Sequence, residues 1–226
     1  MRLPYIVPMQ RRHASTALAA SLLLNGARAQ DAAPLVDAAD RGDLAQVRRL
    51  LDAGAPVEQR DSRGRTAVLA ATAGAHLAVV QLLIARGADV NAQDQQRDSA
   101  FLLAGASGLT DIVRATLAAG ADLKSTNRYG GTALIPACHH GHVDTVRLLL
   151  GTAIDVDHVN NLGWTALLEA VILGDGGPAH TEIVRLLLAR GAKTQIADAQ
   201  GVTPLRHAVQ RGQERIVQLL RQAGAR

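Results

Sequence analysis

The sequence repeats itself at a fixed period, and this period constrains the fold more than any other feature. Four-residue segments that begin with Thr or Ser start at positions 66, 99, 132 and 165, and a related Thr-Pro-Leu segment starts at 203, one period plus five residues later. Self-similarity at a period of about 33 residues is typical of small structural units stacked in a row. The chain is therefore predicted to form a solenoid.

Each repeated position has a local structural interpretation. The Thr or Ser is predicted to cap a first helix, because its hydroxyl oxygen can accept a free backbone N–H. Val and Leu three residues apart predict the buried face of a second helix. Glycines are predicted to end the helices in left-handed turns. The repeated valines are Val47, Val80, Val113, Val146, Val184 and Val217, and the glycines after the second helix are Gly54, Gly87, Gly120, Gly191 and Gly224.

These motifs resemble the ankyrin repeat, and the resemblance covers about residues 31–226. It rests on Thr203-Pro204-Leu205-x-His207-Ala208, on Gly141-His142 and on Gly87-Ala88-Asp89-Val90-Asn91. It implies an all-α fold, an ankyrin-repeat solenoid of six helix-turn-helix units joined by β-hairpin loops, with the first and last units acting as caps. The segment 127–177 is similar to a bacterial subtype, which implies an exported, non-enzymatic interaction protein.

Several positions depart from the repeated pattern. In the third unit Arg97 stands where neighbouring units have Gly, Gly105 lies inside a first helix, and Thr116 replaces a Leu of the second helix. This unit is predicted to be the least stable internal one. Pro136 is interpreted as tolerable because N–H groups in the first turn of a helix lack partners. The five additional residues around 174–177 are predicted to lie in the turn between the two helices of the fifth unit.

The N-terminal segment, positions 1–29, has the pattern of a cleavable signal peptide. Arg11 and Arg12 precede an apolar run at positions 14–24, and Ala27-Arg28-Ala29 follows. The run is shorter than the roughly 20 residues that a membrane-spanning helix needs. We therefore expect cleavage after Ala29, and a domain of residues 30–226 located in the periplasm without a membrane span.

Charge and composition exclude other classes of protein. The chain has 24 Lys and Arg against 20 Asp and Glu, but four of the arginines lie at positions 1–29, which contain no acid. The remainder carries no net charge to attract phosphates, so no nucleic-acid partner is expected. Phosphate-binding, metalloprotease and serine-hydrolase motifs are not found, so we expect neither an enzyme nor a cofactor.

The segment Cys138-His139-His140-Gly141-His142 offers an alternative function. Thiolate and imidazole are ligands for zinc or copper, so a metal-binding or catalytic protein that uses this segment is the alternative interpretation. Cys138, however, falls where the repeat needs a small buried residue, and adjacent ligands on one short turn do not converge tetrahedrally. The sequence therefore predicts no metal site.

The favoured interpretation is a non-enzymatic module of the bacterial periplasm that binds a protein partner through its hairpin tips and concave helical face. Aromatic and Arg side chains are enriched in interface hot spots. The candidate residues are Arg128, Tyr129, Asn161, Trp164 and Glu169, followed by Arg60, Arg63 and Arg65.

Several alternatives remain open at this point. Trp164 could serve only the stacking of neighbouring loops. Glu169 could serve only its helix, because a carboxylate in the first turn is favoured by the helix dipole. The protein could also be a secreted effector that acts on a host protein, or a small-molecule-binding or structural scaffold. A monomer is expected.

Overall fold

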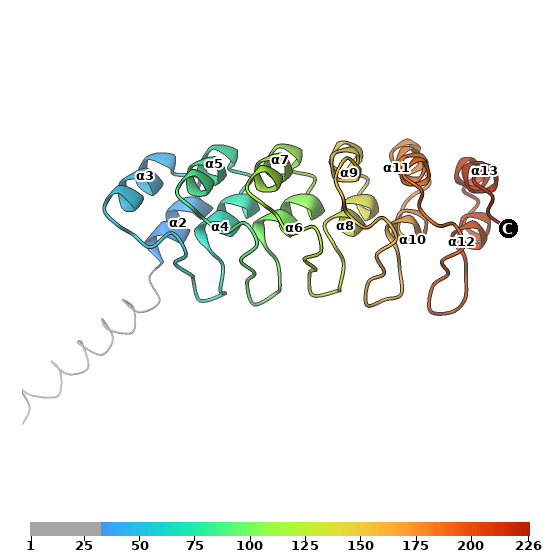
Figure 1. The fold of residues 1–226 in the computed structure, drawn as a ribbon, viewed down its shortest axis with the longest axis horizontal. Helices are drawn as coiled ribbons and strands as arrows, with labels where there is room; N and C mark the ends of the chain where they lie inside the picture. Colours follow the sequence, from blue (N-terminus) through green and yellow to red (C-terminus); the bar gives the residue numbers. More distant parts are fainter. Residues whose placement is uncertain (1–32) are drawn as a thin grey trace, which may run out of the picture. The chain divides into compact units, whose positions relative to one another are not determined.

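Twelve α-helices follow one another in the part of the chain that the structure, a computed structural model, describes, which is residues 33–226. They form six helical hairpins, numbered here as units one to six, and Figure 1 shows these hairpins side by side in chain order. The pairs are α2 (Pro34–Asp40) with α3 (Leu44–Asp52), α4 (Ala67–Ala73) with α5 (Leu77–Ala85), α6 (Ala100–Ala106) with α7 (Thr110–Ala118), α8 (Leu134–His139) with α9 (Val143–Leu150), α10 (Ala166–Ile172) with α11 (Pro178–Ala189), and α12 (Pro204–Gln210) with α13 (Glu214–Gln222).

The predicted all-α solenoid of six helix-turn-helix units is confirmed. First helices form one row and second helices form another, with the long loops on the side of the first helices (Figure 1). The repeated valines are fully buried in units one to five and half-buried in unit six, at the end of the array. Within residues 33–226, no helix has both the length and the apolar character needed to cross a lipid bilayer. The predicted signal peptide, positions 1–29, lies outside the described residues.

The predicted side-chain caps of the first helices form in units two, three, five and six, and the cap is missing in unit four. The hydroxyls of Thr66, Ser99, Thr165 and Thr203 each accept the N–H three residues later, at 3.3 or 3.4 Å. In unit four, α8 begins one residue later, and the buried Thr132 hydroxyl has no hydrogen-bond partner.

Pro136 explains this exception. In the other capped units the N–H at the equivalent position donates to the carbonyl of the capping residue, as from Glu169 to Thr165 at 2.9 Å. Proline lacks this N–H, and Ile135 bonds to the Thr132 carbonyl instead, at 3.2 Å. The prediction that a backbone N–H at this position of the helix would have no partner is wrong, because it is paired in the other capped units.

Close packing accounts for one of the predicted weaknesses of unit three. A Cβ added to Gly105 would lie 2.8 Å from the Cβ of Ala133 and 3.0 Å from its carbonyl oxygen, so glycine is required where α6 meets unit four. The buried Thr116 hydroxyl is satisfied within its own helix, because it donates to the Val113 carbonyl at 2.9 Å. Arg97 has a φ of 62°, a left-handed conformation that costs a residue with a side chain more than it costs glycine.

The additional residues of unit five form both turn and helix. The second helix α11 has 12 residues, compared with eight or nine in the second helices of the other units. Pro178 occupies its first turn, where a missing N–H is tolerated. Asp175 precedes it and accepts the Gly177 N–H at 2.8 Å. The expectation that the insertion lies only in the turn is therefore corrected.

The loops that precede the first helices of units two to six end in tight turns, called the tips below. In the described residues the only strand-like pairing is an isolated bridge between Arg60 and Thr66, so the predicted β-hairpins are hairpin turns without regular strands. One Asp or Asn closes each tip: its N–H donates to the carbonyl four residues later, and its side chain accepts the N–H groups two and four residues later. These residues are Asp61, Asp94, Asn127, Asn160 and Asp198.

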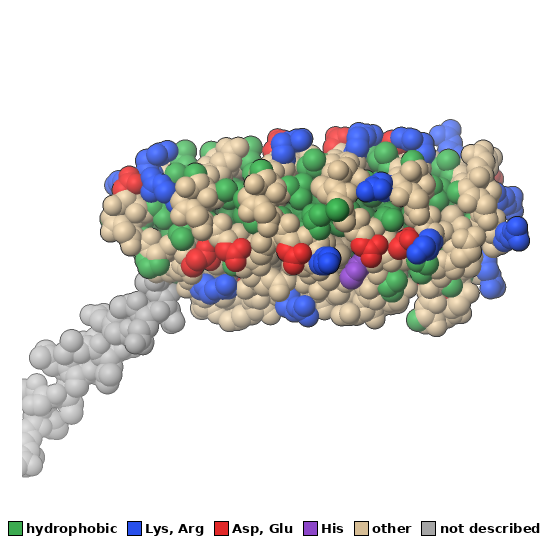
Figure 2. All heavy atoms as spheres, in the orientation of Figure 1, with side chains coloured by type: hydrophobic (Ala, Val, Ile, Leu, Met, Phe, Trp, Pro, Cys, Tyr) green, Lys and Arg blue, Asp and Glu red, His purple; other side chains and the backbone are tan. Residues whose placement is uncertain are grey.

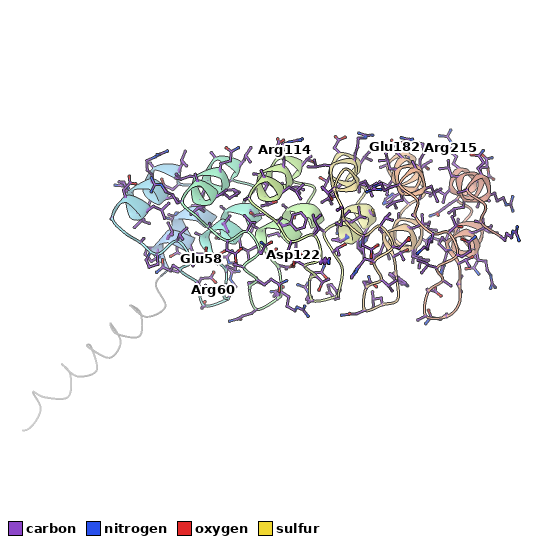
Figure 3. The ribbon with its side chains drawn as sticks, viewed as in Figure 1. Glu58, Arg60, Arg114, Asp122, Glu182 and Arg215 are labelled. Atoms are coloured by element: carbon purple, nitrogen blue, oxygen red, sulfur yellow. The ribbon has the colours of Figure 1, made fainter. Side chains whose placement is uncertain are left out.

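Side chains also connect the loops of neighbouring units. Glu58 accepts the Asp89 N–H at 2.8 Å, and Asn91 in the next unit accepts the Asp122 N–H at 2.8 Å. Figure 2 shows acidic side chains in a row across this face, and Figure 3 labels Glu58 and Asp122 along it. Lys124 occupies the next equivalent position and can only donate, so the connection is absent between units four and five.

Candidate functional site

A pocket of about 430 Å³ lies where units three, four and five meet. The helices α6, α8 and α10 and the three tips that precede them contribute its lining, so the site requires three consecutive units. We call it the tip pocket. Its lining comprises Asp98, Leu103, Ala106, Asn127, Arg128, Tyr129, Gly131, Ile135, Pro136, His139, His140, Asn160, Leu162, Glu169 and Leu173.

Exposed apolar side chains gather around this pocket. Of the five large hydrophobic residues that are exposed in residues 33–226, Tyr129, Leu162 and Leu173 line the pocket, and Val159 lies in the loop that carries Leu162. Tyr129 is 54% exposed and Leu162 is 51% exposed. The fifth residue, Val209, lies on α12 in unit six. Clustered apolar exposure of this kind marks interaction sites on protein surfaces.

Glu169 is the most deeply buried ionisable residue of the lining. Its side chain is 8% exposed, and Asn160 Nδ2 donates to its Oε1 at 3.0 Å. His139 Nδ1 lies 3.7 Å from its Oε2. Burial, opposed only in part by the hydrogen bond from Asn160, raises the pKa of Glu169 to about 7. A dominant helix dipole would lower this pKa, so the position of Glu169 in a first helical turn does not govern its chemistry.

The Cys and His residues of the 138–142 segment do not converge on one point, although the His140 and His142 ring centroids lie 5.8 Å apart. Cys138 is fully buried, and burial, followed by the charge of Glu169, raises the pKa of its thiol. The rings of His139 and His140 stack with centroids 4.2 Å apart at the pocket, whereas His142 packs on the turn at Gly108. Among the described residues, no group of three or more His, Cys, Asp or Glu side chains is placed to hold a metal ion.

Arg128 and Tyr129 form the rim of the tip pocket. Arg128 Nη1 donates to Gln96 Oε1 at 2.7 Å and lies 3.6 Å from an oxygen of Asp98. The guanidinium carbon also lies 4.8 Å from the centroid of the Tyr129 ring. These contacts with the preceding tip hold both residues in place while 46% of the Arg128 side chain stays exposed.

The other predicted residues of tips four and five lie next to the pocket without lining it. Asn161 is exposed, and its backbone N–H donates to the Tyr129 carbonyl at 2.9 Å, which joins the two tips. Trp164 is half-buried, and its backbone closes the turn through Asn160. The structure therefore brings Arg128, Tyr129 and Glu169 into one pocket and places Asn161 and Trp164 beside it.

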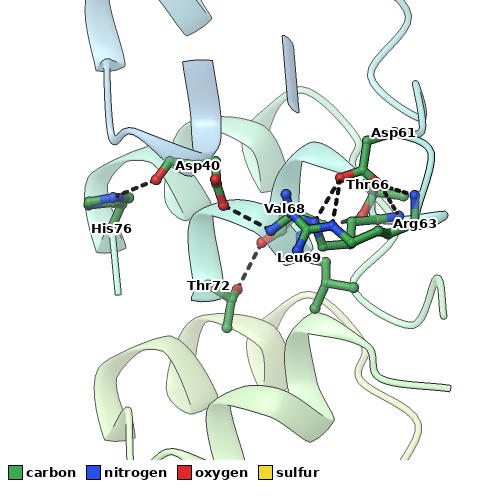
Figure 4. Close-up of polar contacts among 9 residues, drawn as sticks. Asp40, Asp61, Arg63, Thr66, Val68, Leu69, Thr72 and His76 are labelled. Carbon is green, nitrogen blue, oxygen red and sulfur yellow. Dashed lines mark hydrogen bonds and ion pairs between the residues drawn. The ribbon is translucent and has the colours of Figure 1, made fainter. Parts of the chain in front are cut away.

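The predicted arginines Arg60, Arg63 and Arg65 lie on a different tip, before α4, and all three contact other residues of the chain. Arg65 bonds to Asp61 at 2.8 Å and to Asp40 at 2.9 Å. Arg60 donates to the Gly64 and Gln93 carbonyls at 2.7 and 2.8 Å. Arg63, 65% exposed, lies 3.8 Å from Asp61, and Figure 4 shows this contact. Arg65 is half-buried, whereas Arg60 and Arg63 are exposed, and Arg63 leaves most of its side chain open to a partner.

Several residues that line the tip pocket were not predicted from the sequence, although the sequence holds one signal for them. The tip position that holds Arg63 in unit two holds Gln96, Tyr129, Leu162 and Gln200 in the following units. Two apolar residues in a column of otherwise polar, exposed residues mark the rim of the pocket. Asn160 could not be predicted from the sequence either, because its hydrogen bond to Glu169 depends on the contact between the tip and α10.

Paired helices that repeat at a fixed period, turn loops ahead of each pair, and a pocket between helices and tips define an ankyrin-type interaction solenoid. The chain belongs to the ankyrin repeat family, because the family model described as "Ankyrin repeats (3 copies)" matches residues 12–94, 101–198 and 155–226. This fold is generally a non-catalytic interaction module, and the comparisons indicate no enzyme family.

Individual relatives agree with this assignment. An ankyrin repeat domain from Acinetobacter baumannii AYE is 51% identical, with a TM-score of 0.83 over 85% of this chain and 98% of its own. The ankyrin repeat protein EF0377 is 40% identical, with a TM-score of 0.80 over 84% of this chain and 96% of its own. YahD, described as a putative ankyrin repeat protein of Escherichia coli (strain K12), is 51% identical over 57 residues, which are 25% of this chain and 28% of that protein.

Proposed function

We propose that this protein is a non-enzymatic interaction module that binds a protein partner through the tip pocket and the tips around it. The observation that carries the proposal is the position of the exposed large hydrophobic residues, because three of the five in the described chain line one pocket and a fourth lies in the loop that carries Leu162. Tyr129 and Arg128 are also residue types enriched in hot spots. The hydrogen bonds that close each tip keep these side chains in place before a partner arrives, which reduces the entropy lost on binding.

We further propose that the module acts in the bacterial periplasm as a monomer. The support for export is the basic, apolar and Ala-x-Ala pattern of positions 1–29. Fractionation of cells, followed by N-terminal sequencing, tests it: a mature chain that begins at Gln30 is expected in the periplasmic fraction. A chain recovered there or in the cytosol with Arg11 and Arg12 intact refutes export by cleavage. Light scattering of the purified chain tests the monomer.

The binding surface is tested by capture of partners from a native extract with immobilised protein. The expected result is a protein retained by the unmodified chain and lost with Tyr129→Ala or Leu162→Ala, because truncation of a hot spot costs at least about 2 kcal/mol, roughly a 30-fold loss of affinity. Val209→Ala is the matched control, since Val209 is equally exposed but lies in unit six. Equal capture by all three variants would refute the proposal that the partner binds at the tip pocket.

A further inference from the structure

We propose that the tip pocket accepts a lysine or arginine side chain of the partner protein, with the cationic end at Glu169 and the aliphatic stem along the apolar wall. This inference rests on the proposed function and adds the chemistry of the group that is recognised. Its starting point is a buried carboxylate that lines an open pocket and, among the described residues, lacks a permanently charged partner.

The geometry of Glu169 leaves one oxygen for a ligand. Asn160 Nδ2 donates to Oε1 at 3.0 Å. The distance from His139 Nδ1 to Oε2 is 3.7 Å, which is beyond hydrogen-bonding range. A carboxylate can accept about four hydrogen bonds. Oε2 therefore retains its capacity to accept from a donor that enters the pocket.

The charges around the pocket favour a cation. Arg128 lies 3.6 Å from Asp98 and bonds to Gln96. Its positive charge is therefore paired with Asp98, the other carboxylate of the lining, and not with Glu169. The neighbour of Glu169 is His139, and burial, followed by the nearby His140 and His180, lowers the pKa of His139. The lowered pKa disfavours the charged form of His139, and within the described residues Glu169 forms no ion pair with Lys or Arg. A buried carboxylate without a counter-charge gains from a cationic ligand.

The rest of the lining fits the stem of such a side chain. Leu103, Ile135, Leu162 and Leu173 provide apolar surface, and Tyr129 stands at the rim. Lys and Arg bury three or four methylene groups against apolar surface while their charged end meets a polar group. A purely apolar side chain would leave the carboxylate unpaired, and an acidic side chain would be repelled by it.

Small probes test this inference directly, whichever protein is the partner. The cationic probes are Nα-acetyl-lysine methylamide and Nα-acetyl-arginine methylamide, and their neutral counterparts carry Nε-acetyl-lysine and citrulline. Each probe is titrated at pH 8 into the ¹⁵N-labelled chain and followed by NMR chemical shifts. We expect saturable shifts of amides around Asn160, Leu162 and Glu169. Cationic probes should bind at least about tenfold more tightly, because hydrogen bonds to charged groups are stronger than those to neutral groups.

Glu169→Gln should remove the preference for the cationic probes, and Glu182→Gln on the second helix α11 should leave it unchanged. The inference is overturned if the cationic probes produce no saturable shifts, if neutral probes bind equally well, if the shifts fall on other units, or if Glu169→Gln keeps the preference. Loss of partner capture with Tyr129→Ala or Leu162→Ala, combined with any of these results, would leave the proposed interaction surface standing and refute only the cationic ligand.

Discussion

Replacement of Glu169 by Gln should change the pH dependence of stability in a defined direction. Burial raises the pKa of Glu169 from its ordinary 4.5 to about 7. The folded state therefore holds a proton between these values that the unfolded state has released, and stability falls as the pH rises through this window. A difference of this size corresponds to roughly 3 kcal/mol at pH 8, at about 1.36 kcal/mol per pKa unit.

Gln keeps the oxygen that accepts from Asn160 but cannot ionise. The variant should match the unmodified protein at pH 4.5 and exceed its free energy of unfolding by up to about 3 kcal/mol at pH 8. Urea denaturation at several pH values, followed by circular dichroism, measures this difference. The gain should appear between pH 4.5 and 7 and then stay constant.

Glu182→Gln provides a control with the same chemical change. Hydrogen bonds from Arg185, opposed by slight burial, lower the pKa of Glu182, so this substitution should bring no gain at high pH. A difference between the Glu169→Gln variant and the unmodified protein that stays constant from pH 4.5 to 8 would refute the reasoning. The same holds for a variant that is less stable at pH 8, since either result means that Glu169 is ionised at little cost.

Three further predictions concern local structure, and thermal or urea denaturation measures each. Gly105→Ala should destabilise the fold by about 1–3 kcal/mol, because the new Cβ would overlap Ala133; unchanged stability would mean that α6 moves away freely. Arg97→Gly should stabilise by up to about 1 kcal/mol, since the left-handed conformation at φ 62° suits glycine, and a loss would show that the Arg97 side chain matters more than its backbone. Pro136→Ala should stabilise by about 1 kcal/mol, because an N–H returns to the Thr132 carbonyl and the Thr132 hydroxyl can act as a cap; an unchanged or lower midpoint would contradict this explanation.

Local chemistry explains why so much of the fold was predictable. The structural effect of each repeated residue is local: it concerns cap hydroxyls, buried Val and Leu faces and turn glycines, each within a few residues in the sequence. The fixed period places the same local structure in every unit. Even Ala75, where the repeat has Gly, takes the left-handed conformation that the pattern predicts, at φ 56°. In a solenoid each unit contacts only its neighbours, so local signals add up to the global architecture.

The sequence by itself thus determined the class of fold, the number of units and the side of the molecule that carries Arg128 and Tyr129. Only the tertiary structure decided that Glu169 is buried, that Asn160 bonds to it, and that these residues share a pocket with Leu162. These three features arise from side-chain contacts that form only when the units are packed together. A carboxylate in a first helical turn looks the same in the sequence whether it faces water or a neighbouring helix, and its pKa and its role follow from that packing.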